Sequence, residues 1–267
     1  MDVFIGFDSA WTDRPDAPGA ICALEMDDAR PVRFHPPRLA SFCAALAFAE
    51  QVRSRPGCTL LAIDQPTIVP NQTGMRPVER AASRLIGWLG GGVQAAHRGR
   101  VGMFCDDSPI WRFLASLGGV QAPEEARTSA HGLYLVEVFP ALALPSIDGR
   151  FFGRGAAPRY NPERRTFRQE SWVAVAQAVA GQFRQLGLDE PAAWSRAAAS
   201  LTKPAKADQD RLDAMICLLI ALRWRLGPRA GSLLLGDLDR GYMVAPASPD
   251  VRRRLAEIAS RDGVPMT

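Results

Sequence analysis

The chain has 267 residues, of which 47% are hydrophobic, 22% charged and 8% aromatic, the ordinary profile of a globular protein. This composition excludes a disordered chain, a collagen-like repeat and a small disulfide scaffold. The longest apolar run, residues 214–222, is about half of the ~20 residues that a membrane helix needs, so we expect no contact with a membrane. The net charge is +4, and all but two of the 32 basic residues are arginine. Arginine suits bidentate contact with phosphate, although a biased genome gives the same excess.

The cysteines indicate a reducing compartment. Five of them are scattered along the chain, and no two stand in a Cys-x-x-Cys pair. This argues against a disulfide framework and against a structural zinc site. The first residues include neither a basic region nor a long apolar segment, so we expect no secretory signal and a cytoplasmic protein.

Apolar periodicity and turn residues predict the elements in chain order. We expect strands over 3–8, 19–26, 31–35 and 59–63, with a helix over 39–52 before the fourth strand. Residues 66–130 are rich in glycine, proline and arginine and carry two modest helices, over 78–89 and 109–117. These elements are followed by a fifth strand over 133–139, a loop over 145–162 and helices around 172–183 and 194. A strong helix then begins just after Asp210, and the last elements are a strand near 242–244 and a helix over 251–258. The simplest account is one α/β domain over 1–267, with residues 65–131 inserted over the sheet and 247–267 as a helical tail.

Carboxylates interrupt four of these apolar elements. Asp8 and Asp64 end two strands, Glu137 lies inside a third, and Asp210 and Asp213 stand three apart at the start of the strong helix. In α/β sheets, ligands collect beyond the carboxyl ends of parallel strands. Carboxylates gathered there must take up protons or bind a cation, and their hard oxygen atoms suit Mg²⁺ or Mn²⁺. Such ions can activate water for phosphodiester cleavage.

Each carboxylate also has an ordinary structural interpretation. Asp8 and Asp64 could cap a turn or simply end a strand, and Asp210 could be a helix N-cap, with Asp213 at the third helical position. Glu137 fits such an interpretation less well, because an unpartnered carboxylate between two valines in an apolar strand is costly. The joint occurrence of all five acids favours a site.

Six short motifs carry a resemblance to a known family. They are Gly6-x-Asp8, Ile63-Asp64-x-Pro66, Gly74-Met75-Arg76-Pro77, Val136-Glu137-Val138-x-Pro140, Asp210-x-x-Asp213-Ala214 and Gly241-Tyr242-Met243-Val244-x-Pro246. In this order the chain resembles a bacterial family of uncharacterised proteins described as predicted RNase H-like nucleases, within the RNase H- and resolvase-like superfamily. The pattern departs at Ala141, where many relatives have an acid, and at Gln209, which is often aspartate.

The resemblance implies a fold, an activity and a site. The fold is an RNase H-like mixed five-stranded sheet flanked by helices, with the insertion between the fourth and fifth core strands. The activity is metal-dependent hydrolysis of a nucleic-acid phosphodiester, with Mg²⁺ or Mn²⁺ as cofactor. Its catalytic residues would be Asp8, Asp64, Glu137 and Asp213, and its metal ligands the same four with Asp210. The alternative is a catalytically inactive nucleotide- or nucleic-acid-binding protein of the same fold.

Substrate contacts are expected from a basic segment. Residues 149–168 contain six arginines interleaved with four aromatic residues, a pattern typical of surfaces that contact a phosphate backbone and stack bases. The expected contacts are Arg154, Arg159, Tyr160 and Arg164 from this segment, together with Arg76 and Lys206 from other parts of the chain. A solvated loop whose aromatic residues belong to the core remains an alternative. ATP-dependent phosphotransfer is disfavoured, because Ser9-Ala10-Trp11 and not a glycine-rich phosphate loop follows Asp8. The sequence leaves open DNA, RNA or a small phosphodiester as substrate, and a homodimer as the assembly.

Overall fold

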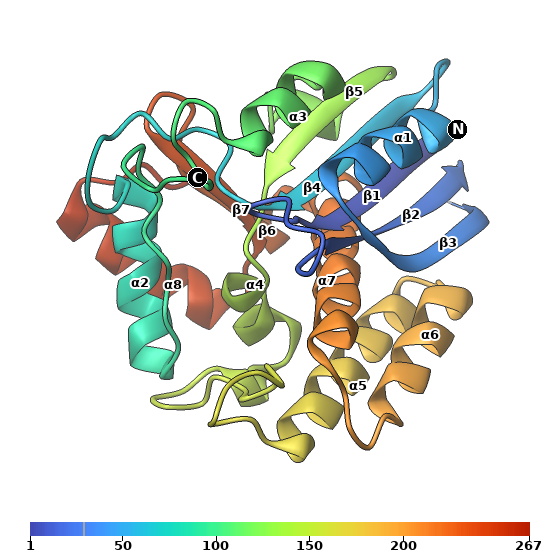
Figure 1. Ribbon diagram of the computed structural model, residues 1–267. Helices are drawn as coiled ribbons and strands as arrows, with labels where there is room; N and C mark the ends of the chain where they lie inside the picture. The colour runs from blue at the N-terminus through green and yellow to red at the C-terminus, as the bar shows by residue number, and fades with distance from the viewer. Residues whose placement is uncertain (29) are drawn as a thin grey trace.

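A computed structural model describes residues 1–28 and 30–267 of the chain (Figure 1). The strands are β1 (Asp2–Asp8), β2 (Gly19–Asp27), β3 (Arg30–Ala40), β4 (Cys58–Asp64), β5 (Gly132–Glu137), β6 (Ser232–Asp237) and β7 (Gly241–Pro246). The α-helices are α1 (Phe42–Val52), α2 (Pro77–Leu89), α3 (Pro109–Leu117), α4 (Pro140–Ile147), α5 (Gln169–Gln185), α6 (Asp189–Ala199), α7 (Lys206–Leu226) and α8 (Pro249–Asp262). Among these described residues, no helix is both long and apolar enough to cross a membrane.

The main sheet has five strands in the order β3-β2-β1-β4-β5. The β1–β2 and β2–β3 pairs are antiparallel, whereas β1–β4 and β4–β5 are parallel. This is the α/β fold with an RNase H-like mixed sheet that the sequence predicted, and the long insertion falls between β4 and β5 as expected. Because β1, β4 and β5 are parallel, their carboxyl ends meet at one edge of the sheet.

Helices cover both faces of this sheet. On one face, α7 runs beneath β1 and β2, with α5 and α6 packed outside it (Figure 1). The buried rings of Trp172 and Trp224 belong to this layer. On the other face lie α1 and α3, where the rings of Phe7 and Phe42 stand 5.9 Å apart and both contact Phe113.

The insertion is divided between two places. Helix α3 packs on the sheet, whereas α2 packs beside α8 and the β6–β7 hairpin in a separate hydrophobic cluster. The strand β6 and the helix α4 were not predicted. Two helix starts also differ: β3 extends to Ala40, so α1 begins at Phe42 behind the N-cap Ser41, and α7 begins at Lys206 rather than after Asp210.

Helix α7 approaches β1 so closely that only glycine fits between them. A Cβ atom at Gly6 would lie 2.1 Å from the carbonyl oxygen of Ala214 and 2.4 Å from the amide nitrogen of Leu218. The thiol of Cys22 donates to the same Ala214 carbonyl over 3.4 Å. The glycine of the Gly6-x-Asp8 motif therefore fixes the distance between the sheet and the part of α7 that carries Asp213.

We predict that Gly6→Ala destabilises the protein by about 1–3 kcal/mol or more, because the added methyl group overpacks backbone that cannot move aside. Gly181→Ala is the matched control, since a Cβ atom there, within α5, would meet nothing within 4 Å. The control should leave stability unchanged or raise it by up to ~1 kcal/mol. Urea unfolding of both variants measures the difference. Equal midpoints for Gly6→Ala and the wild type would contradict the close approach.

Candidate active site

Three aspartates meet at the carboxyl edge of the sheet. Asp8 and Asp64 are register partners on the parallel strands β1 and β4, and neighbouring strands lie about 4.8 Å apart. Their side chains share the α7 face, because Phe4 and Leu60, an even number of residues before them, pack in the α7 layer. Asp213 reaches the same place from α7, one residue before the contact with Gly6.

Burial and mutual repulsion disfavour the charged forms of these acids. Burial raises the pKa of Asp8 well above its ordinary value, and the charges of Asp213 and Asp64 raise it further. The pKa of Asp64 is raised in the same way by burial and by Asp213. Burial raises the pKa of Asp213 to about 6. The three carboxylates thus share a site in which negative charge is under-compensated.

Two neutral donors fix the orientation of Asp213. The hydroxyl of Tyr160 donates to Oδ1 over 2.8 Å, and Nε2 of Gln209 donates to Oδ2 over 2.8 Å. Gln209 lies four residues earlier on α7, so both side chains share one helix face. Its Oε1 is buried without a hydrogen-bond partner in the described part of the chain. Tyr160, which the sequence proposed as a substrate contact, instead turns inward to the acids.

Lys206 supplies the positive charge next to this cluster. Its ammonium group pairs with Asp210, one helical turn later. Burial alone would lower the pKa of Lys206, but the carboxylates of Asp8, Asp210 and Asp213 together raise it. The structure excludes Asp210 as the N-cap, because α7 begins at Lys206 and its first turn is closed by a bond from the Ala205 amide to Asp208.

Glu137 lies at the same edge but is held separately. Leu133 and Leu135 pack against α1 and α3, and the alternation of β5 turns Glu137 to that face rather than to α7. Nη2 of Arg76 donates to Oε1 over 2.6 Å, Nη1 donates to Oε2 over 3.0 Å, and the Thr67 amide donates to Oε2 over 2.9 Å. Its charge nevertheless raises the pKa of Asp64.

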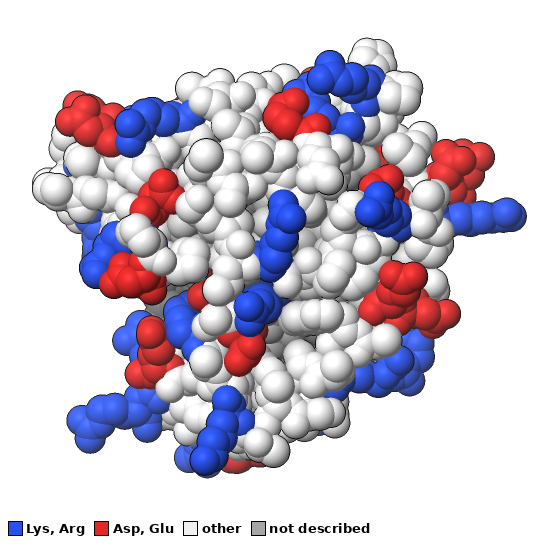
Figure 2. Space-filling model, turned by 45° about the vertical axis from the view of Figure 1, so that its right-hand side comes forward, with Lys and Arg blue, Asp and Glu red and all other residues white. Residues whose placement is uncertain are grey.

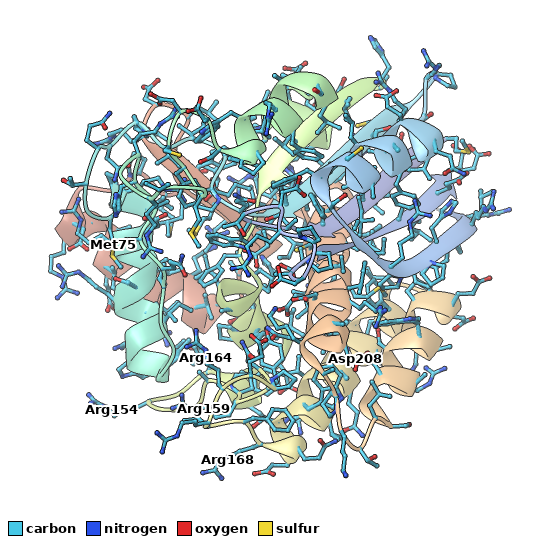
Figure 3. All side chains as sticks on the ribbon, in the orientation of Figure 1. Met75, Arg154, Arg159, Arg164, Arg168 and Asp208 are labelled. Carbon is cyan, nitrogen blue, oxygen red and sulfur yellow. The ribbon has the colours of Figure 1, made fainter. Side chains whose placement is uncertain are left out.

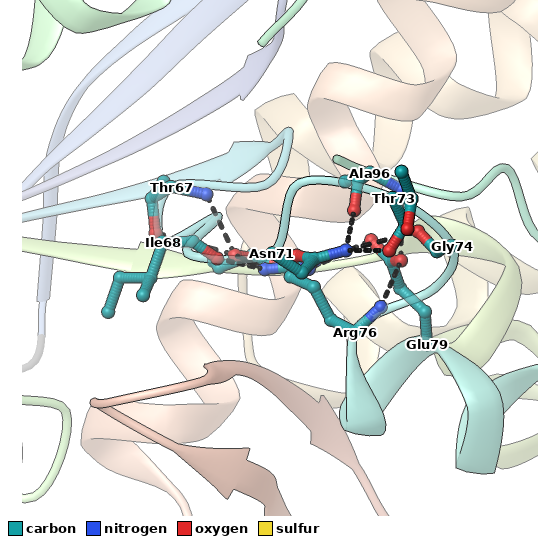
Figure 4. Close-up of polar contacts among 9 residues, drawn as sticks. Thr67, Ile68, Asn71, Thr73, Gly74, Arg76, Glu79 and Ala96 are labelled. Atoms are coloured by element: carbon teal, nitrogen blue, oxygen red, sulfur yellow. Dashed lines mark hydrogen bonds and ion pairs between the residues drawn. The ribbon is translucent and has the colours of Figure 1, made fainter. Parts of the chain in front are cut away.

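Arg76 is completely buried and pairs with two acids, of which Figure 4 labels Glu79. Besides Glu137 it contacts Glu79, with Nε donating to Oε1 over 2.8 Å. In the loop before Arg76, the side-chain amide of Asn71 donates to the carbonyls of Thr73 and Gly74. The Gly74-Met75-Arg76-Pro77 motif therefore builds an internal ion-pair cluster. The guanidinium, named above as a substrate contact, has no exposed surface in this structure.

A cleft of about 380 Å³ opens onto the acids. Asp8, Asp210 and Lys206 form one end of its lining, and Trp11 and Met103 form part of the rest. Asp16 and Glu163 also line it, and the carboxylate of Asp16 pairs with the guanidinium of Arg14 over 2.7 Å. Asp8, Glu163 and Asp210 therefore share the ammonium group of Lys206 on this lining. An anionic substrate entering this cleft would be repelled unless a cation accompanied it.

The arginines of residues 149–168 lie on the surface. Arg154, Arg159 and Arg164 are exposed, and Figure 3 shows them along the same side of the molecule. Arg159 lines a second pocket, of about 440 Å³, together with Arg150 and Arg168 at the start of α5. Elsewhere basic and acidic side chains are interspersed, with no continuous basic field on the face in Figure 2. Any phosphate contact made by this segment is therefore local.

The three aspartates have the oxygen atoms that a divalent ion prefers, but these atoms are not arranged around a metal position. Within residues 1–28 and 30–267, no group of three or more His, Cys, Asp or Glu side chains is placed so that it could hold a metal ion. Yet Asp8, Asp64 and Asp213 supply carboxylate oxygens, the ligands that Mg²⁺ and Mn²⁺ prefer. Small side-chain rotations away from Tyr160 and Gln209 would free the oxygens of Asp213.

The fold and these acids define an α/β protein with an RNase H-like core and a buried acidic cluster at its carboxyl edge. The chain belongs to the family described as "Protein of unknown function (DUF429)", whose family model matches residues 6–234. Neither the curated proteins nor the solved structures gave a match to this chain. The matched range includes all the acids of the site.

We predict that Asp213→Asn stabilises the protein at pH 8 in EDTA. The pKa of Asp213 is raised to about 6, so the folded state loses stability as the pH rises through that value. The variant avoids this loss, and the amide of Gln209 can turn so that its free Oε1 accepts from the new amide. The gain should be about 1 kcal/mol or more at pH 8, since one pK unit corresponds to about 1.4 kcal/mol. It should vanish near pH 4. Urea unfolding at both pH values measures it, and a pH-independent difference would contradict the burial of a titrating carboxyl group.

Proposed function

We propose that this protein is a Mg²⁺- or Mn²⁺-dependent hydrolase of nucleic-acid phosphodiesters. The observation that carries the proposal is the meeting of Asp8, Asp64 and Asp213, from three separate elements, in one buried and under-compensated site. Proteins keep such clusters at functional sites, because a purely structural role would favour pairing or replacement. The free cysteines are consistent with the cytoplasm as its location.

The three aspartates and Asp210 would hold the cation at the end of the cleft. A bound divalent ion would supply an activated water and a Lewis acid for the phosphodiester. Three side chains of the protein would position the ligands and the substrate at this end of the cleft. Tyr160 and Gln209 hold the Asp213 carboxylate toward the cluster, and Lys206 adds positive charge where a phosphate would arrive.

Glu137 and Arg76 act as positioning residues in this proposal. Both oxygens of Glu137 accept from the guanidinium, and one also accepts the amide of Thr67, three residues after Asp64. This fixes the turn that follows β4 and hence the direction of Asp64. The sequence-based roles of Glu137 as a ligand and of Arg76 as a substrate contact would require this pair to open.

A catalytically inactive binding protein is the second candidate. It is favoured by the occupation of both Asp213 oxygens by Tyr160 and Gln209, and by the pairing of Asp210 with Lys206. These contacts satisfy two of the acids without a metal ion. The cleft and the exposed arginines would then bind a nucleotide or nucleic acid without cleaving it.

A metal titration separates the two candidates. We expect millimolar Mn²⁺ to raise the melting temperature of the wild type, because a ligand that binds only the folded state stabilises it. Mn²⁺ should also support cleavage of an oligonucleotide. Asp213→Asn should lose both effects, whereas Asp208→Asn, on the same helix but outside the cluster, should keep them. Absence of both effects in the wild type would favour the inactive protein. Full activity of Asp213→Asn would show that Asp213 is not a metal ligand.

The exposed arginines give a separate prediction. Replacing Arg154, Arg159 and Arg164 by alanine should weaken binding of a labelled oligonucleotide and flatten its dependence on salt, because fewer counterions are released. The control replaces Arg30, Arg33 and Arg55, which are exposed at the sheet's other end, and should leave the slope unchanged. Equal slopes for both triple variants would show that residues 149–168 do not meet the backbone.

A further inference from the structure

The cleft at Asp8 has one charged end and one apolar wall. Asp8, Asp210 and Lys206 form the charged end, while Trp11 and Met103 contribute the wall, together with Pro18 and Leu39. Clefts of this kind orient a ligand with a few polar groups and bind it through apolar contact. The wall lies beside the acids, because Trp11 follows Asp8 by only three residues.

Trp11 has a backbone conformation that favours glycine. Its φ is +45°, at the first central position of a turn closed by a bond from the Asp13 amide to the Ala10 carbonyl over 2.8 Å. A bulky side chain is uncommon in this region, and the strain persists only where the surroundings fix it. Since glycine would form this turn without strain, the presence of tryptophan points to a role for its side chain.

The surrounding contacts hold the Trp11 turn in place. The Ser9 hydroxyl donates to the side chain of Gln65, and the Asp13 carboxylate accepts the amide of Phe42 over 2.8 Å. The indole ring packs edge to face against Phe104, with centroids 5.9 Å apart and an angle of 73°. Trp11 is half-buried against the hydrophobic cluster that contains Phe104, and it lines the cleft.

We propose that the Trp11 ring is the stacking platform for one unpaired nucleobase, whose phosphate then meets the charged end of the cleft. This rests on the proposed function for the phosphate and adds the substrate class: a single-stranded nucleic acid or a nucleotide. A base within a duplex is stacked on both faces and cannot lie on an indole ring. Base stacking on aromatic rings tolerates every base, which suits a wall built from Trp11 and Met103.

The test compares two probes that differ only in the base. Adenosine monophosphate and ribose 5-phosphate are titrated into the wild type in the presence of Mn²⁺, by calorimetry. We expect the nucleotide to bind about tenfold more tightly or better, the effect of one stacked base. Trp11→Phe should keep most of this preference, and Trp11→Leu, which retains apolar contact without a stacking ring, should abolish it.

Trp111→Leu is the matched control. Its indole also contacts Phe104, but it donates to the Cys105 carbonyl and carries Arg98 on its face, outside the cleft lining. This variant should keep the preference for the nucleotide even if it melts earlier.

Equal binding of the two probes by the wild type, or a preference that survives in Trp11→Leu, would overturn the stacking platform. The proposed hydrolysis fails independently, if Mn²⁺ supports no cleavage while the nucleotide is still preferred. Cleavage with no preference for the base would support the proposed hydrolase and contradict the stacking role of Trp11.

Discussion

The close approach of α7 to β1 sets the geometry on which the candidate site depends. At Gly6 the helix backbone lies where a Cβ atom would otherwise be, and the next inward residue of the strand is Asp8. The helix residue at this contact, Ala214, directly follows Asp213. The backbone packing at Gly6 therefore brings the two carboxylates together. The parallel pairing of β1 with β4 then adds Asp64 at the same level.

The edge of the sheet holds its buried acids in two opposite ways. Glu79 and Glu137 share the guanidinium of Arg76, and backbone amides complete their hydrogen bonds. Removing Arg76 would leave two buried carboxylates without their cation, which is strongly destabilising. Asp8 and Asp64, in contrast, are affected by other carboxylates that raise their pKa values, and the charge of Lys206 opposes this effect. The contrast within one edge of one sheet distinguishes the positioning cluster from the candidate active site.

The sequence predicted the sheet, and it marked Asp8 and Asp64 because apolar strands that end in aspartate carry a local signal. It did not reveal the partner of Glu137, because Arg76 lies 61 residues away and only the folded loop brings them together. The alternation of β5 was nevertheless readable: Leu133, Leu135 and Glu137 share one side of the strand. The start of α7 was missed because Ala205 is not a capping residue, and the cap comes instead from Asp208 within the first turn.

Charge balance connects the acidic cluster to the cleft beside it. Lys206 pairs with Asp210 and Arg14 pairs with Asp16, whereas Asp8 and Glu163 remain on the lining without an ion pair among the described residues. In the proposed function, affinity for a nucleotide would come from two sources: a cation that reverses the charge at the acidic end, and contact with an uncharged part of the ligand. Trp11 lies where the second contribution would arise, at a turn position that glycine would occupy without strain. The two contributions act on different parts of one ligand, so the base can be recognised whether or not the phosphodiester is cleaved.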